Sequence, residues 1–270
     1  MSQQRINETL SREPNRWPKR PAIGALILLL IGLCLPYVQF NKFSQDGLNI
    51  ATKILTYFFQ PQWDMLLNFT STAGVPYLLL ETMCIALLGT IIGAIISLPL
   101  AFLSSRNITG SLGSTVGVVI ITIIRCIPAL VYVLIFIQVE TGPVAGILAF
   151  SITSVGMISK LFIEAIEELD KGILEALDSS GSTMFQKIRY GIIPQLKSNF
   201  LSTTIYRFEI NVKNATILGM VGAGGIGAEL IFAMNAFRWK DATTLLIGII
   251  VLVIIIEQLS SWLRGKLING

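Results

Sequence analysis

Apolar runs of about the length needed to cross a bilayer dominate this 270-residue sequence. A helix needs about 20 mostly apolar residues to span the hydrocarbon core. Apolar residues make up 53% of the chain and charged residues 13%, roughly half the charged share of a soluble domain. Six segments have the required length: 21–40, 83–103, 116–138, 143–162, 200–222 and 242–263. We therefore predict an all-α, polytopic membrane protein with about six transmembrane helices.

The placement of Lys and Arg predicts which side each connecting segment faces, because cytoplasmic loops carry an excess of both. With the N-terminus inside, thirteen fall on the cytoplasmic side: Arg5, Arg12, Arg16, Lys19, Arg20, Arg106, Lys160, Lys171, Lys187, Arg189, Lys197, Arg264 and Lys266. Four fall outside: Lys42, Lys53, Arg238 and Lys240. We expect the protein in the inner or plasma membrane of the cell. Both termini should then lie in the cytoplasm. The net charge of +4 then reflects topology and lipid contact, not nucleic-acid binding.

The N-terminal part is expected to comprise a cytoplasmic tail over 1–20, then a transmembrane helix and an external linker over 21–74. The polar leader is long and no small-x-small cleavage site follows the apolar run, which favours a retained anchor over a signal peptide. The linker is rich in aromatic residues: Tyr57, Phe58, Phe59, Trp63 and Phe69. Aromatic side chains prefer the membrane interface, so we expect a surface-lying helix, with protein binding as the alternative.

Residue types exclude several kinds of site. The chain has no histidine, which rules out histidine metal ligands and bases. Its three cysteines, Cys34, Cys84 and Cys126, lie in apolar runs and do not have the spacing of metal ligands. We therefore expect these cysteines to be small, buried hydrophobic side chains, and we expect no metal site. The sequence shows no grouping of a nucleophile with a base, and we expect no catalytic residue.

The longest cytoplasmic segment, 163–199, has helical spacing and a polar composition. An apolar stripe that begins just before this segment consists of Leu161, Ile166, Leu169, Ile173 and Leu177. Gly181 is expected to end this helix, Ser182 to cap a second one, and Pro194 to mark the second helix's end or a kink. The prediction is two short helices joined at a glycine across the membrane face. An amphipathic interfacial helix without a partner is the alternative.

This segment resembles the signature of ABC-importer permease subunits, which is Glu-Ala-Ala, three residues, Gly, nine residues, Ile-x-Leu-Pro. The residues in register are Glu175, Ala176, Gly181 and Pro194. The departures are Leu177 for Ala, Gly191 for Ile and Ile193 for Leu. The stretches IRCIPALVYVLIFI, 124–137, and YRFEINVKNATILGMVGAGGIGAEL, 206–230, are similar to the phosphonate-importer branch of that family.

The resemblance implies a type I ABC importer permease core of five helices over 75–270, preceded by one N-terminal helix. It implies that the coupling loop 163–199 docks on a cytoplasmic ABC ATPase dimer through Glu175, Ala176, Gly181 and Pro194. ATP and Mg belong to that partner, because this chain has no G-x-x-x-x-G-K-[ST] motif, and we expect no cofactor here. A second permease copy, or a homologous partner, and an external binding protein complete the importer. The implied cargo is phosphonate or a related phosphorus oxyanion. A permease for methionine or another small substrate is the alternative, and a secondary transporter is a further one.

The fifth span carries charges that must face protein or water, because a charge at the bilayer centre costs about 2.5–3.5 kcal/mol. At 100° per residue Arg207, Asn211 and Asn214 share one face, which we interpret as a candidate translocation path. Glu209 and Lys213, four residues apart, form a candidate structural ion pair. The alternative for Arg207 is a structural role at the cytoplasmic interface.

Three further features lie in or beside the spans. We expect Arg125 at the inner interface if Pro128 breaks the third span. Gly89 and Gly93 form a G-x-x-x-G close-packing pattern. The GAGGIG run fits a dinucleotide fingerprint, but no βαβ pattern surrounds it. Its glycines, Gly222, Gly224, Gly225 and Gly227, are instead predicted to form a tight bend and a candidate outer gate, with flexible packing as the alternative.

Overall fold

The computed structural model describes residues 19–37 and 45–269, and these residues contain no strand. The chain divides into two compact units, 1–50 and 51–270. The first holds α2 (Lys19–Cys34), the short 3-10 helix η1 (Leu35–Tyr37) and the beginning of α3 (Gln45–Phe58). Most of the expected tail, 1–18, and the external Lys42 lie outside the described residues. A helix does form in the expected linker, and its place on the membrane surface stays a prediction.

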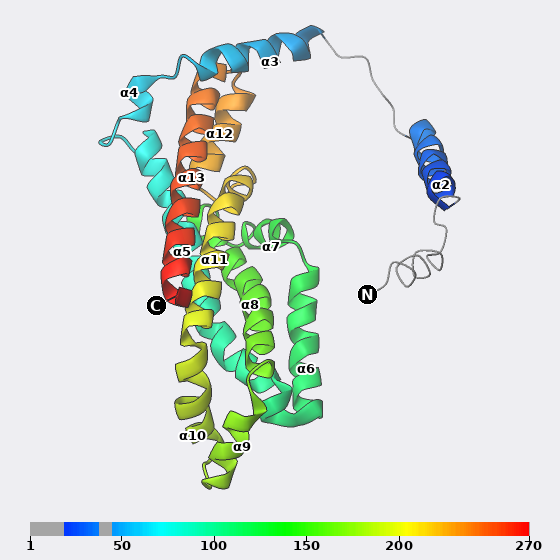
Figure 1. The fold of residues 1–270 in the computed structure, drawn as a ribbon. Coiled ribbons are helices and arrows are strands. Elements are labelled where there is room, and N and C mark those ends of the chain that lie inside the picture. Colours follow the sequence, from blue (N-terminus) through cyan, green and yellow to red (C-terminus); the bar gives the residue numbers. More distant parts are fainter. Residues whose placement is uncertain (1–18, 38–44, 270) are drawn as a thin grey trace, which may run out of the picture. The chain divides into compact units, whose positions relative to one another are not determined.

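The second unit is a bundle of helices (Figure 1). Its elements are α4 (Trp63–Leu66), α5 (Val75–Ser104), α6 (Arg106–Cys126), α7 (Ala129–Phe136), α8 (Pro143–Glu167), α9 (Lys171–Ser179), α10 (Met184–Gln186), the π-helical turn η2 (Lys187–Ile192), α11 (Ile193–Gly219), α12 (Ile226–Asn235) and α13 (Trp239–Asn269). Within the described residues, α5, α6, α8 and α13 are long and apolar enough to cross a membrane. α11 has the length, but its polar residues keep it below that level of hydropathy, and α2 has only 16 residues.

Among the predicted spans, the second and the third have the largest shifts of their first residue in the structure. The second begins at Val75 instead of residue 83, with Pro76 in its first turn, where a missing N–H is tolerated. The third begins at Arg106 instead of residue 116, because the polar stretch after Arg106 is helical on both sides of a kink at Gly110. It ends at Cys126, since Ile127 is extended and Pro128 precedes the separate helix α7.

The predicted close packing at Gly89 and Gly93 is confirmed. A Cβ atom at Gly89 would lie 2.5 Å from the Phe150 Cβ, and one at Gly93 would lie 2.5 Å from the Ser154 Cβ. α5 therefore packs backbone to backbone against α8, which is what small residues permit between membrane helices. The expected burial of the cysteines is wrong, because Cys34, Cys84 and Cys126 are all exposed on the chain. An apolar run in a membrane helix can equally supply the surface that faces lipid.

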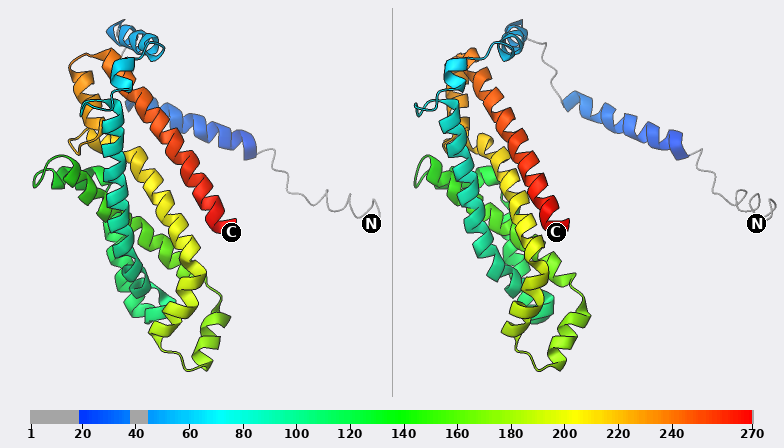
Figure 2. Two further views of the ribbon diagram at one scale, coloured as in Figure 1. Left: turned by 90° about the vertical axis from the view of Figure 1, so that its left-hand side faces the viewer. Right: turned by 60° about the vertical axis from the view of Figure 1, so that its left-hand side comes forward.

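Segments assigned to the cytoplasm by their basic residues meet at one end of the second unit. There the Arg106 backbone N–H donates to Glu167 at 2.9 Å, and the rings of Phe162 and Phe200 lie 4.3 Å apart. At the opposite end the Gln62 backbone N–H donates to the Thr244 hydroxyl at 3.0 Å. α9 and α10 extend beyond the bundle at the first end, as both views in Figure 2 show.

Candidate coupling and translocation sites

The turn after α9 is fixed by a helix-ending motif. Gly181 has a φ of +71°, its N–H donates to the Asp178 carbonyl at 2.9 Å, and the Ser182 N–H donates to the Leu177 carbonyl at 3.1 Å. These two hydrogen bonds, with glycine in the left-handed region, satisfy the last carbonyls of the helix. The predicted helix end at Gly181 is therefore confirmed. At the other end the Asp170 carboxylate caps α9 by accepting from the Gly172 N–H.

The helix after this turn differs from the prediction in two ways. Its N-cap is Thr183 and not Ser182, because Thr183 and Gln186 form a reciprocal capping box. It is also not a separate helix, since α10 continues through η2 into α11 (Figure 1). Pro194 lies in the first turn of α11, directly after this wide turn, and does not end the helix. Proline has no N–H for the carbonyl four residues earlier, which accounts for the irregular turn.

The residues expected to contact an ATPase are accessible in the structure. Glu175, Ala176, Gly181 and Pro194 are all exposed, and an ion pair between Lys187 and Asp178 holds the two arms of the turn together. Large apolar side chains nearby are exposed too: Met184, Phe185 and Tyr190. Such a patch at the end of the bundle is typical of an interaction surface.

A cavity of about 270 Å³ lies between α8, α11 and the junction of α6 with α7. Its polar lining comes from Arg125, Thr153, Arg207 and Asn214, and the Met157 side chain also contributes. The structure therefore brings together Arg207 and Asn214, two of the three residues expected on the translocation path.

Asn211, the third, lies outside the cavity lining. Its side chain is fully buried and its Nδ2 donates to the hydroxyls of Thr90 on α5 and Ser154 on α8, both at 2.9 Å. Ser154 also accepts from the Arg207 Nε at 3.1 Å. Arg207 is 8% exposed, and its Nη1 lies 3.1 Å from the Met157 sulfur, a weak acceptor.

The expectation that Arg125 lies at the inner interface is wrong. Its stem packs against Gly156, near the middle of α8, where an added Cβ would come within 2.8 Å of the Arg125 Cγ. The reason is the early start of α6 at Arg106, which puts Arg125 in the last turn of that helix. Because Arg125 was expected at the inner interface, it was not among the residues predicted to line the translocation path.

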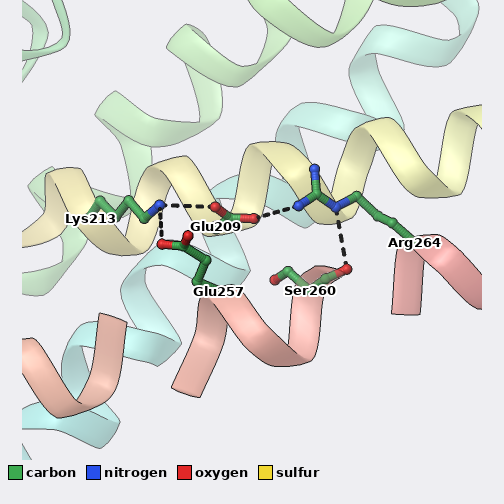
Figure 3. Close-up of polar contacts among 5 residues, drawn as sticks. All are labelled: Glu209, Lys213, Glu257, Ser260 and Arg264. Atoms are coloured by element: carbon green, nitrogen blue, oxygen red, sulfur yellow. Dashed lines mark hydrogen bonds and ion pairs between the residues drawn. The ribbon is translucent and has the colours of Figure 1, made fainter. Parts of the chain in front are cut away.

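On its other side α11 carries a chain of charges (Figure 3). The buried Glu209 carboxylate accepts from Lys213 at 2.9 Å and from Arg264 at 3.0 Å, and Lys213 also pairs with Glu257 at 3.0 Å. The predicted pair is thus part of a network that joins α11 to α13. The pairing of Glu257 with Lys213 and of Arg264 with Glu209 was not predicted, although a spacing of seven residues places Glu257 and Arg264 on one face of the last helix.

The glycine-rich run forms a sharp bend between α11 and α12. Gly222, Gly224 and Gly225 have left-handed φ values, and a Cβ at Gly227 would lie 2.0 Å from the Thr216 carbonyl oxygen on α11. The Ile226 N–H donates to the Thr82 hydroxyl of α5 at 2.9 Å, which fixes the bend to the bundle. The preceding ATILGMV stretch is mostly helix, so the strand of a dinucleotide fold is missing here. An outer-gate role for these glycines stays a prediction. No group of acidic or cysteine side chains suited to a metal ion occurs among the described residues.

Comparison with known protein families assigns most of the second unit to one family. Residues 89–267 match the model named binding-protein-dependent transport system inner membrane component. This chain belongs to that family. It is a permease subunit of a transport system and a multi-pass membrane protein.

Individual permeases of known transport systems are similar to a large part of this chain. The phosphite transport system permease protein PtxC of Stutzerimonas stutzeri is 35% identical over 69% of this chain and 68% of its own length. HtxC of the same organism, a candidate phosphite transport system permease protein, is 32% identical over 98% of this chain and 95% of its own length. A solved inward-facing MetNI methionine ABC transporter shares the fold, with a TM-score of 0.61, 20% identity, and a match of 70% of this chain with 94% of that one. The all-α, type I ABC importer permease architecture is confirmed.

Proposed function

We propose that this permease forms the membrane path for a phosphorus oxyanion, such as phosphite or a phosphonate, in an ATP-driven importer. The observation that carries the proposal is the similarity along almost the whole chain to a candidate phosphite permease. An arginine-lined cavity without an acidic residue supports it, because guanidinium groups bind oxyanions well.

The ATPase in this proposal is a separate cytoplasmic dimer that holds ATP and Mg. It would contact the exposed turn around Gly181 through Glu175 and Ala176, beside the apolar side chains of Met184 and Phe185. The count of thirteen basic residues against four supports a cytoplasmic position for this turn and for both termini. A binding protein would deliver the anion at the opposite end, near the glycine bend, and a second permease copy would complete the path.

The test is reconstitution of the permease with its ATPase and its binding protein in liposomes. ATP-driven uptake of labelled phosphite or methylphosphonate is expected, and uptake should stop when the ATPase is omitted. Uptake by the permease alone would overturn the importer mechanism. Uptake of methionine without any phosphorus oxyanion would overturn the substrate class and leave the mechanism intact.

A further inference from the structure

We propose that Arg125 and Arg207 form an arginine pair that binds the transported oxyanion inside the membrane, a role that rests on the substrate class proposed above. The two residues lie far apart in sequence, on α6 and α11, yet they line the same cavity. Arg125 would thereby be a specificity-determining residue.

The end of α6 positions the first arginine of the pair. Ile127 is extended and Pro128 has no N–H, so α6 stops directly after Cys126 and the chain turns into α7. The Tyr132 hydroxyl of α7 donates back to the Ile124 carbonyl at 3.1 Å, which fixes this corner. Gly156 on α8 leaves the room that the stem of Arg125 occupies.

The charge of the cavity is positive and uncompensated. Its lining includes both arginines and no carboxylate. Glu209, two residues along α11 from Arg207, is already bound by Lys213 and Arg264. Among the described residues, neither arginine of the pair forms a salt bridge. Cationic groups within membrane spans are costly, and they are retained mainly where they have a function. An anion entering the cavity would supply the missing charge.

The contacts of Arg207 suit a small tetrahedral anion. Its Nε is held by Ser154, which orients the guanidinium, while the Met157 sulfur at Nη1 is a weak acceptor that an oxyanion could displace. Arg125 is exposed in the single chain and could move toward the same ligand. The cavity volume of about 270 Å³ lies just below the range for drug-sized ligands. Because the two arginines belong to different helices, movement of α11 would change their spacing and release the anion.

The first test measures transport and ATP hydrolysis in the complete reconstituted importer. Arg125→Gln is expected to lower methylphosphonate uptake about tenfold or more, the size of one lost charged hydrogen bond. Arg125→Lys should lie between Gln and wild type, because lysine keeps the charge and loses the planar fork. ATP hydrolysis stimulated by the binding protein should persist. Arg106→Gln, at the other end of α6, is the matched control and should transport normally. Wild-type uptake by Arg125→Gln would overturn the proposal.

A second test needs no transport. In a background with Cys34→Ser, Cys84→Ser and Cys126→Ser, Arg125→Cys is treated with anionic and with cationic methanethiosulfonate reagents. Adding Arg207→Gln should lower the ratio of anionic to cationic reaction rates, because the charge of Arg207 attracts the anionic reagent. An unchanged ratio would overturn the pair whatever the importer carries. Failure of the wild-type importer to carry any phosphorus oxyanion would instead overturn the proposed substrate, while the rate ratio would still report the shared cavity.

Discussion

Ser154 illustrates how one hydroxyl on α8 can hold two polar side chains of α11. It accepts from the Arg207 Nε at 3.1 Å and from the Asn211 Nδ2 at 2.9 Å. Ser154→Ala leaves both donors without this acceptor, so we expect the free energy of unfolding to fall by about 1–3 kcal/mol. Thermal unfolding of the detergent-solubilised permease would measure the change.

Ser151→Ala is the matched control, one turn earlier on α8. The Ser151 hydroxyl donates only to the Ile147 carbonyl of its own helix, so its loss should cost much less. Equal destabilisation by both variants would contradict the shared-acceptor role of Ser154.

At the residue scale, helical periodicity predicted which α11 side chains share a face but not what each one meets. Asn211 is buried because Thr90 and Ser154 approach it from helices far away in the sequence. Arg125 was misplaced because its environment depends on where α6 begins and on the room at Gly156. Both outcomes are decided by tertiary packing, which spacing along a single segment does not contain.

At the scale of helices, Glu209 connects α11 to α13 (Figure 3). Glu209→Gln keeps the shape and removes the charge that Lys213 and Arg264 share. Glu209 is buried, but Lys213 and Arg264 are partly exposed and Lys213 keeps Glu257, so the cost should lie between that of an exposed and that of a buried pair, about 1–3 kcal/mol. We therefore expect a measurable loss of thermal stability and increased protease access to the end of α13.

The matched control for this substitution is Glu164→Gln on α8. Glu164 pairs with Lys160 at 3.1 Å, but both side chains are exposed, and such pairs contribute about 0–1 kcal/mol. A Glu209→Gln variant that is as stable as Glu164→Gln would show that the network does not hold the two helices together.

Hydrophobic runs predicted where the long helices lie, but they did not predict where those helices begin and end. α5 starts eight residues before its predicted span and α6 ten residues before, because polar or proline-containing first turns remain helical. The continuity of α10, η2 and α11 was not expected, since Pro194 was predicted to mark the end of the second helix or a kink. A π-helical turn accommodates the proline without ending the helix.

At the scale of the whole importer, this continuity offers a direct route from the ATPase to the cavity. The helical stretch from Met184 to Gly219 begins at the exposed turn and carries Arg207 and Asn214. Displacement of the turn would therefore move the cavity lining with no intervening loop. We expect the contact between α9 and η2 to determine how well ATP hydrolysis is coupled to transport.

That contact explains two departures from the ABC-permease signature together. Leu177 replaces the signature alanine and Gly191 replaces its isoleucine, and the two residues meet: a Cβ at Gly191 would lie 2.6 Å from the Leu177 Cδ1. The large residue has changed sides, and the Leu–Gly pair carries four side-chain carbons where the signature's Ala–Ile pair carries five. Leu177 can shift its tip for one methyl group, but a branched isoleucine at residue 191 requires the arms to separate.

A double-mutant cycle tests this exchange. Gly191→Ile alone should overfill the contact and raise the ATP hydrolysed per anion imported, and Leu177→Ala alone should leave a gap with a smaller effect. The double variant restores the signature pair and is expected to be closer to wild type than Gly191→Ile, with a coupling energy of about 0.5–3 kcal/mol in thermal stability. Uptake and ATP hydrolysis measured in the same proteoliposomes give the ratio. Additive effects would show that the two positions act independently, and the turn would then transmit force by some contact other than this one.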